Sequence, residues 1–530
     1  MTTIKIVSQT VTFVLLKFPL LIAALFIATL MRRIIALGAY IFKRGVFLGI
    51  VPVVGSSFVK LSTGFLNVAK LREEFQAKIL QAKKAEFSGF LYPELKCGFE
   101  PYYSNILTSS VRRLLSLTSP KDDKDTHWRY YGGARDNCRT LIRGEIKNTN
   151  NSLETIKIDF RFWNNYTDLP KISDLTTPEN WNKLINYVTY ERLWHVEKPL
   201  WELLVMNDVL TRTDSGMTIL IWRCSHVLCD GLSVLKMATK LFDSEVPNVL
   251  RHQRSLDRSR IISMCKSPYN FLLQNAALES NDTQIPRPIR EDFTPQGNLV
   301  TKTSVPIAMT FLKRIKDAYR VDIQTILLAG VASAIRNHYR EIGHPIDSDV
   351  KTGFILPQSA THPGGLVNNV RSPTILLPIG ENDSVRRLQL IAVRVKMSHS
   401  PYVQLIGQCL NQLVATLPLR LGRSVVEKMH TLRPVVVNNI VGPPNKLYLF
   451  GHQVSIIHAG VNIKAAENRG FAFYFCFYTY QDIGNLEVRG FDEYFPDMNL
   501  APDKFLADCV SEWKQLFRFC GGYRGRNKII

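Results

Sequence analysis

An apolar stretch near the N-terminus constrains the architecture of this chain more than any other feature. The 21 residues from Val11 to Met31 carry a single charged side chain, Lys17. At about 1.5 Å per residue, a helix of this length spans roughly the 30 Å hydrocarbon thickness of a bilayer. A cleaved signal peptide is disfavoured, because the stretch is long for an h-region and runs into Arg32 and Arg33 without a small-residue cleavage site. We therefore predict an N-terminal transmembrane anchor.

The extent of this anchor is open. The next segment, residues 34–55, is also apolar but is interrupted by Lys43 and Arg44, so it could form a second span, a hairpin or an interfacial helix. We assign residues 1–60 to the anchor, with one or two hydrophobic segments. Basic residues cluster after the first span, so a single span would leave the remaining chain cytosolic, and a second span would reverse this. We expect an integral membrane protein of the endoplasmic reticulum, with the plasma membrane as the alternative and the catalytic domains in the cytosol.

A charged amphipathic segment follows at residues 61–95. Its sequence between Lys60 and Glu86 indicates a helix that either is solvated or lies on anionic lipid. The choice stays open at this point.

The net charge of +21 and the pI of about 9.6 require an anionic partner. Zinc-finger spacings, RNA-recognition aromatic signatures and phosphate-binding Gly-Lys-Ser/Thr loops are absent from the sequence, so a nucleic-acid partner is disfavoured. An anionic membrane face and a phosphorylated small substrate remain. The nine cysteines are irregularly spaced without a CxxC pair, so neither a metal site nor a disulfide scaffold is predicted.

Strand-like and helical segments alternate after residue 96, which indicates an α/β fold. A proline-containing break at 282–300 predicts a linker between an N-terminal domain at 96–281 and a C-terminal domain at 301–530. Apolar patterns predict helices at Leu232–Phe242 and Ile323–Tyr339, and strands at Met217–Cys224, Arg433–Asn439, Lys446–Phe450 and Phe471–Tyr480.

The segment from Ser225 to Gly231 lies between a predicted buried strand and a predicted helix. A histidine held at a strand end, His226, is suited to accept a proton near neutral pH. Asp230 can fold back through the turn to fix the loop, and Gly231 permits the backbone conformation needed to enter the helix. The alternative is that His226 has a purely structural role and that Asp-Gly is an ordinary turn or helix cap.

The flanking sequence resembles a known family. His226 to Gly231 matches the HxxxDG core of the acyltransferases related to chloramphenicol acetyltransferase. The upstream segment Pro199, Leu200, Trp201 and Glu202 is similar to the PLWE motif of the wax ester synthase/diacylglycerol acyltransferase family. Three C-terminal segments also resemble that family: Gly365–Asn369, Leu377–Gly380, and Asn438–Pro444 followed by Leu447–Gly451. The resemblance covers roughly Tyr190 to Phe517.

This resemblance implies two chloramphenicol-acetyltransferase-like domains side by side, with a central substrate channel between them. It implies an acyl-CoA-dependent O-acyltransferase that esterifies a lipid alcohol, converting diacylglycerol to triacylglycerol or a fatty alcohol to a wax ester. Acyl-CoA is then a co-substrate, and no cofactor or metal is implied. His226 would be the general base and Asp230 a structural residue of its loop. Channel or domain-packing roles are implied for Pro199, Leu200, Trp201, Asn369, Asn439, Gly442 and Pro443.

Three departures from the family pattern keep the acceptor open. Ser225 replaces the first histidine of HHxxxDG, Asp322–Thr325 replaces the TxND helix start, and Asn438 replaces the serine before NVPGP. One alternative changes the acceptor to a sterol, a retinoid or a short-chain alcohol. Another is a non-catalytic lipid-binding or scaffolding relative. The oligomeric state is not predicted.

Overall fold

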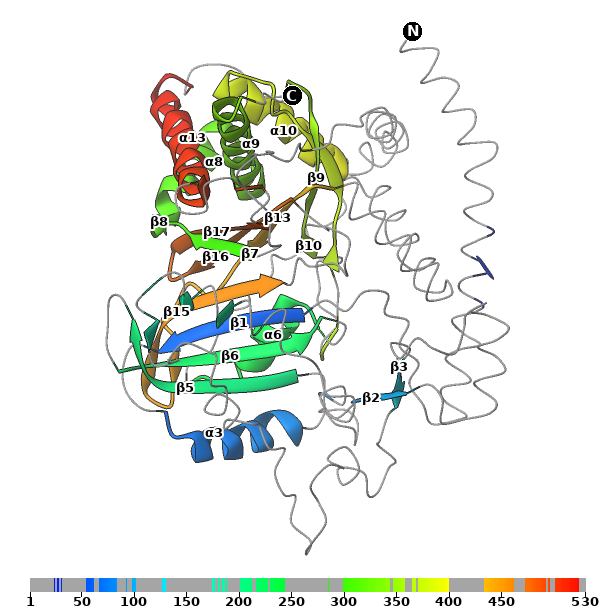
Figure 1. Ribbon diagram of the computed structural model, residues 1–530, viewed down its shortest axis with the longest axis vertical. Coiled ribbons are helices and arrows are strands. Elements are labelled where there is room, and N and C mark those ends of the chain that lie inside the picture. Colours follow the sequence, from blue (N-terminus) through cyan, green and yellow to red (C-terminus); the bar gives the residue numbers. More distant parts are fainter. Residues whose placement is uncertain are drawn as a thin grey trace, which may run out of the picture.

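A computed structural model defines two mixed α/β bodies, each built on one large sheet (Figure 1). It describes residues 54–61, 66–82, 98–101, 126–129, 201–211, 216–226, 229–243, 299–343, 347–357, 365–367, 370–399, 433–461, 472–491 and 501–523, with isolated residues elsewhere. The predicted α/β class is confirmed by this mixture.

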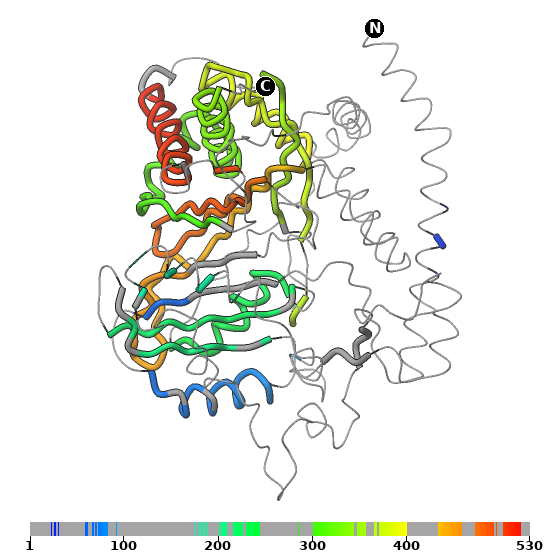
Figure 2. The backbone as a smooth tube through the Cα atoms, in the orientation of Figure 1, coloured from blue at the N-terminus to red at the C-terminus, as the bar shows by residue number. Residues whose placement is uncertain are grey.

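The first sheet combines strands from both halves of the sequence. Its six strands follow the order β14 (Tyr448–Leu449), β15 (His452–Val461), β1 (Val54–Leu61), β6 (Met217–Ser225), β5 (Trp201–Thr211) and β4 (Asp174–Leu175). β1 lies between β15 and β6 and is antiparallel to both. In Figure 2 the orange chain of the C-terminal half runs beside blue and green segments of the N-terminal half. The two halves are therefore joined within one sheet.

The position of β1 changes the predicted boundary of the membrane segment. Residues 54–60 were expected to belong to the anchor, but all of them pair with β6 and residues 55–60 also pair with β15. A strand of this sheet cannot also be part of a membrane-spanning helix, because its amide groups are already bonded to the neighbouring strands. Any anchor must therefore end before Val54. The predicted linker at 282–300 likewise overlaps the first two residues of β7 (Leu299–Thr303).

The first sheet has two buried faces. Alternate residues of β5 and β6, including Trp201, Leu203 and Trp222, pack on one face against α3 (Val68–Phe75) and the π-helical turn η2 (Gln76–Leu80). α6 (Gly231–Ala238) joins the same core through Met237. The opposite face carries Leu204, Ile219 and Ile221, which contact the buried side chains Leu184, Ile185 and Val188. β6 is thus buried on both faces, which explains its nearly continuous apolar sequence.

The predicted amphipathic helix is shorter than its sequence suggested. Lys60 and Leu61 belong to β1, and the helix spans α3 and η2. Its apolar side chains Leu71, Phe75 and Ile79 pack into the sheet, whereas Lys70 and Lys78 are exposed. The apolar face is therefore occupied by protein and the basic side chains stay exposed, which is compatible with both predicted alternatives, a solvated helix and a basic strip on anionic lipid.

The second sheet has seven strands and is built from the C-terminal half. The order is β12 (Thr374–Leu377), β9 (Val350–Phe354), β13 (Val435–Ile440), β16 (Phe473–Tyr480), β17 (Ile483–Phe491) and β7, with β8 (Ile307–Ala308) also paired to β17. Two parallel pairs, β9–β13 and β13–β16, form its centre. Four helices pack on it: α8 (Met309–Tyr319), α9 (Ile323–Glu341), α10 (Ser384–Ser398) and α13 (Ala501–Tyr523). Two short pairs lie apart, β2 (Gly98–Pro101) with β3 (Thr126–Arg129), and β10 (Leu356–Pro357) with β11 (Val370–Arg371).

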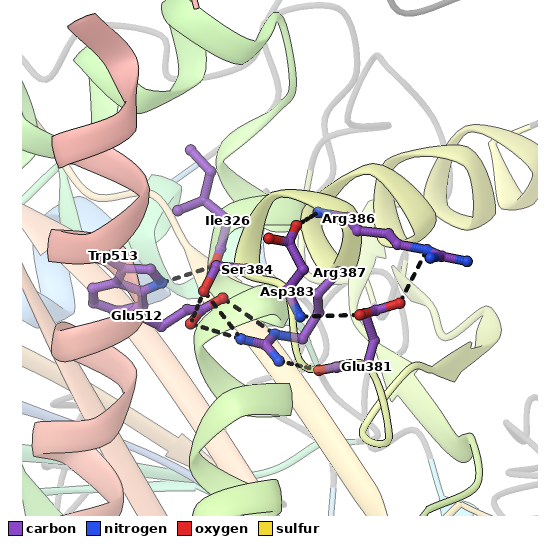
Figure 3. Close-up of polar contacts among 8 residues, drawn as sticks. All are labelled: Ile326, Glu381, Asp383, Ser384, Arg386, Arg387, Glu512 and Trp513. Carbon is purple, nitrogen blue, oxygen red and sulfur yellow. Dashed lines mark hydrogen bonds and ion pairs between the residues drawn. The ribbon is translucent and has the colours of Figure 1, made fainter. Parts of the chain in front are cut away.

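A buried polar network holds the helical layer together (Figure 3). The Arg387 guanidinium donates to both carboxylate oxygens of Glu512, at 3.1 and 2.8 Å, and the Ser384 hydroxyl donates to the same carboxylate at 2.9 Å. Trp513 Nε1 donates to the Ile326 carbonyl at 2.8 Å. These contacts join α9, α10 and α13, and the bidentate arrangement satisfies two charges that are both removed from water.

Most predicted elements are present with small shifts at their ends. The predicted strand Met217–Cys224 is β6, and the predicted helix Ile323–Tyr339 is α9. The helix expected at Leu232–Phe242 is α6, which begins one residue earlier and ends at Ala238. The predicted strands Arg433–Asn439, Lys446–Phe450 and Phe471–Tyr480 correspond to β13, β14 and β16.

The predicted membrane span falls largely outside the described residues. Its described members Ala23, Phe26, Ile27 and Leu30 are helical, and Phe26 and Ile27 are 71% and 59% exposed. Over the described part of the chain, none of the helices is by itself long and apolar enough to cross a bilayer; α8 and α9 together meet the length and composition, with a bend of 100° between them.

Candidate active site

The loop after β6 places His226 at the end of a rigid strand. β6 ends at Ser225, which pairs with Val54 of β1, and His226 follows in a turn where it is half-buried. Because β6 is bonded on both sides, the backbone that carries His226 is fixed as far as Ser225. The side chain of Ser225 lies outside the described parts.

Asp230 begins the helix that follows this loop. Its backbone is extended, and its carboxylate accepts a hydrogen bond of 2.8 Å from the Ser233 amide, which makes it the N-cap of α6. This contact satisfies one of the amide groups that a helix start leaves unpaired. The structure therefore holds the Asp230 side chain by a hydrogen bond from the backbone of α6.

Gly231 lies at the helix entry, as expected. It is the first residue of α6 and is not among the glycines with positive φ. The preceding residue, Asp230, has an extended backbone and makes the transition into the helix. A Cβ built on Gly231 would meet no described atom within 4 Å.

Burial lowers the pKa of His226 below its ordinary value of 6.5, while a hydrogen bond with its own backbone and the negative charge of Asp230 act in the opposite direction. Desolvation disfavours the charged imidazolium, so the neutral ring is favoured. A neutral imidazole is the form that can accept a proton. The electrostatics of the loop therefore suit His226 to act as a base at neutral pH.

The C-terminal half reaches this loop through Val367. The Val367 carbonyl accepts hydrogen bonds from the Asp230 amide at 2.9 Å and from the Ser233 hydroxyl at 2.8 Å. The Val367 amide donates back to the Ser233 Oγ at 3.2 Å. Val367, in the segment Gly365–Asn369, is thus bonded to both ends of the first turn of α6.

The other end of α6 is held by the same half of the chain. The amide of Asp243 donates to the Tyr448 carbonyl at 2.8 Å, and its carboxylate accepts from the Gly451 amide at 2.7 Å. Gly451 has φ of +83°, a conformation that favours glycine. The Leu447–Gly451 motif therefore serves to hold α6 and the first sheet.

Trp201 lies in the core under β6. It is the first residue of β5, pairs with Cys224, and stacks on Trp222 with ring centroids 5.2 Å apart. Phe75 of α3 packs on the same pair. Pro199 and Leu200 lie outside the described residues. β5, which begins at Trp201, and β6, which ends just before His226, form an antiparallel pair.

The other C-terminal motif residues make packing contacts. Asn439 lies in β13 opposite Phe477, and the Pro443 carbonyl accepts from the Gln481 amide at 3.1 Å. The Gly442 amide donates to Thr479 Oγ1 at 3.1 Å, and a Cβ on Gly442 would lie only 2.1 Å from the Thr479 carbonyl oxygen. Glycine is therefore required there by close backbone approach. Asn369 lies outside the described residues.

Two cysteines flank the loop inside the core. Cys224 and Cys229 are both buried, with their sulfur atoms 3.6 Å apart. This is consistent with a packing role for Cys229. Within the described residues, no group of three or more His, Cys, Asp or Glu side chains is arranged to hold a metal ion.

The altered helix start at Asp322 keeps its capping function. The Asp322 carboxylate accepts from the Thr325 amide at 2.7 Å and from the Thr325 hydroxyl at 2.6 Å. The replacement of the TxND helix start by Asp322–Thr325 therefore leaves the N-cap of α9 intact.

Ser233, Asp243 and Val367 were not identified from the sequence. The spacing of Asp230 and Ser233 is that of an N-cap and its third helical residue, so it could have indicated the cap. The contacts with Val367 and Tyr448 join positions 134 and more than 200 residues apart. Local patterns carry no signal for such contacts.

A known family model matches part of the C-terminal half. Residues 367–505 match the family model of the WS/DGAT C-terminal domain, where the letters stand for wax ester synthase and diacylglycerol acyltransferase. The resemblance drawn from the sequence motifs is thus confirmed, and Val367, which binds the His226 loop, is the first residue of the match. The WS/DGAT family is a family of acyltransferases.

The structure is also similar to solved structures of acyltransferases and related proteins. The wax ester synthase/diacylglycerol acyltransferase from Marinobacter aquaeolei is 14% identical, with a TM-score of 0.48 over 89% of this chain and 96% of that chain. The trichothecene 15-O-acetyltransferase from Fusarium sporotrichioides is 12% identical, with a TM-score of 0.49 over 89% of this chain and 94% of that chain. No curated protein sequence matches the chain.

Proposed function

We propose that this protein is an acyl-CoA-dependent O-acyltransferase that esterifies a lipid alcohol, with His226 as the general base. The observation that carries the proposal is the bonding of the WS/DGAT segment at Val367 to the capped turn beside His226. The substrates would meet where the two halves touch, in a channel beside this loop.

The chemistry requires an activated alcohol. A thioester carbonyl is already reactive, but an alcohol is almost entirely protonated at neutral pH. The neutral His226 ring would accept the hydroxyl proton as the alcohol oxygen bonds to the acyl carbon. The carbon–sulfur bond then breaks, and the proton passes from the imidazolium to the departing CoA thiolate. This direct transfer needs no covalent acyl-enzyme, and Cys229, buried in the core, is left with its packing role.

The surroundings of His226 support this role. Its pKa is lowered by burial, which keeps the ring neutral, and Asp230 is engaged as the cap of α6 rather than as a proton carrier. The free space beside Gly231 would admit a substrate atom close to the loop.

The lipid nature of the acceptor is inferred from the N-terminal segment. Phe26, Ile27 and Leu30 are helical and largely exposed within an otherwise apolar run, as expected for side chains that face lipid. Anchoring would keep the active site where diacylglycerol and fatty alcohols concentrate. Part of the +21 charge would serve the phosphates of CoA and part the anionic membrane surface.

A turnover assay tests this proposal. Full-length protein in detergent is given palmitoyl-CoA with diacylglycerol, hexadecanol or ethanol, and both ester and free CoA are measured. We expect ester formation with the two lipid alcohols and its loss in His226→Ala. Faster acylation of ethanol at matched concentration would reject the lipid acceptor. Saturable binding of palmitoyl-CoA without transfer to any alcohol would instead indicate a lipid-binding relative.

A further inference from the structure

The helix that carries the Asp230 cap is held at both ends by the C-terminal half. At its start, Asp230 and Ser233 bind the backbone of Val367, and at its end Asp243 binds the backbone of Tyr448 and Gly451. Every one of these contacts includes a main-chain group of the C-terminal half. The geometry of the His226 loop therefore depends on where that half places its backbone.

Ser233 has a particular position among these contacts. Its hydroxyl donates to the Val367 carbonyl and accepts from the Val367 amide, so one side chain satisfies both polar groups of a single residue. Its own amide is the donor to the Asp230 carboxylate. Ser233 is fully buried, so water cannot replace its hydroxyl without opening the contact.

We propose that Ser233 is the positioning residue of the active site: it fixes the His226 loop against Val367 and so sets the position of the base relative to the C-terminal half. Ser233 acts through the loop and does not touch substrate. The expected effect on kinetics rests on the proposed acyltransferase function. The positioning of the His226 loop can be measured without turnover.

The consequence follows from the bonds that are lost. Ser233→Ala keeps the amide bond to Asp230 but leaves the Val367 amide unpaired and removes one donor from its carbonyl. The segment at Val367 and the loop would separate or admit water, and His226 would become more hydrated. Asp230 is the charged side chain that acts on His226 among the described groups, and the substitution retains it.

The chain provides a matched control in the same helix. Thr239, the C-cap of α6, also has a hydroxyl contact, which is partly buried, but it donates to the Lys236 carbonyl three residues earlier in the same helix. Thr239→Ala therefore deletes a hydroxyl from the same helix without touching the C-terminal half. Ser233→Thr retains the hydroxyl and serves as the conservative rescue.

The first measurement is the rate of carbethoxylation of His226 by diethylpyrocarbonate as a function of pH, followed by mass spectrometry. In Ser233→Ala we expect faster labelling and an apparent His226 pKa closer to 6.5, because desolvation is what lowers it. Thr239→Ala and Ser233→Thr should label like the parent protein. Unchanged labelling in Ser233→Ala, or an equal change in Thr239→Ala, overturns the positioning role.

The second measurement is steady-state kinetics with palmitoyl-CoA and the best alcohol. Displacement of a catalytic group by about 1 Å can cost ~10²-fold in rate, so we expect Ser233→Ala to lower kcat by roughly 10- to 100-fold with little change in the KM for palmitoyl-CoA. Ser233→Thr should recover most of kcat. If the parent protein shows no acyl transfer, the proposed function fails and the labelling result still decides the role of Ser233. If the parent is active and kcat of Ser233→Ala stays within about twofold, the positioning role fails alone.

Discussion

His226 carries the proposed reaction, so its replacement is the most direct test of the chemistry. General-base assistance is typically worth ~10²–10⁴ in rate. We expect His226→Ala to lower kcat by that factor while the thermal melting curve stays close to that of the parent, since the side chain is half-buried in a turn. Ser225→Ala is the neighbouring control and should be mild. Near-normal turnover of His226→Ala would reject the mechanism.

The pH profile of the parent enzyme reports the state of the same ring. Burial lowers the pKa of His226, so the neutral base persists to more acidic pH than for a solvated histidine. The acidic limb of kcat/KM, which reports the free enzyme, should therefore lie below pH 6.5.

Asp230→Asn should shift this pH profile in a direction that the structure predicts. Asparagine keeps a capping oxygen for the Ser233 amide, so α6 should remain intact, but it removes the negative charge that raises the pKa of His226. The acidic limb should move further toward low pH. A shift in the alkaline direction would contradict this account of the loop.

At the scale of elements, the predicted anchor and β1 are adjacent in the sequence. The anchor is expected to lie in the bilayer, whereas β1 needs neighbouring strands as hydrogen-bond partners. Deletion of residues 1–50 should move the protein from the carbonate-resistant membrane fraction to the soluble fraction, while the fold is retained because β1 stays complete. A deletion that continues to Lys60 removes most of β1 and leaves β6 and β15 without their shared neighbour. We expect that variant to aggregate. Retention of the shorter deletion in the carbonate-resistant fraction would reject the N-terminal anchor.

The close contact between α9 and α13 predicts that a larger residue at Gly330 lowers thermal stability. A Cβ on Gly330 would lie 2.5 Å from Trp513 Nε1, the atom that donates to the Ile326 carbonyl (Figure 3). Overpacking of a core typically costs 1–3 kcal/mol, against about 1 kcal/mol gained from replacing a helical glycine by alanine. Gly330→Ala should therefore lower the melting temperature. Gly231→Ala, at a helix position with free space, is the control and should not.

At the scale of the whole molecule, the two halves share one sheet and cannot be separated as folded domains. A break between residues 290 and 291 places β1, β5 and β6 in one fragment and β14 and β15 in the other. Each fragment alone would expose a strand edge and lose part of a common core, to which Leu447, Leu449 and Val454 contribute.

We therefore expect each fragment to be insoluble when expressed alone and the two to copurify when expressed together. Size-exclusion chromatography of the separate and the co-expressed fragments measures this. Two soluble, monomeric fragments with cooperative melting transitions would contradict the shared sheet as the source of stability.

The sequence by itself determined the local elements and the chemistry that they carry. The apolar run of β6, the capped start of α6 and the buried pattern of α9 are all set by neighbours in the chain, so the place of His226 between a strand and a helix was predictable. The resemblance to the WS/DGAT family could be recognised for the same reason, since each motif is a short local segment, and residues 367–505 match the C-terminal model of that family.

Only the tertiary structure decided how distant segments combine. The Val54–Leu61 segment continues an apolar stretch and contains Gly55 and two serines, so nothing local distinguishes it from the end of a membrane segment. Its identity as a strand comes from β15 and β6, which supply its hydrogen-bond partners. The contact of Ser233 with Val367 likewise depends on segments that lie far apart in the sequence. Side-chain periodicity reports which face of an element is buried, but the choice of partner depends on long-range packing. Here that packing joins the His226 loop, α6 and the C-terminal half.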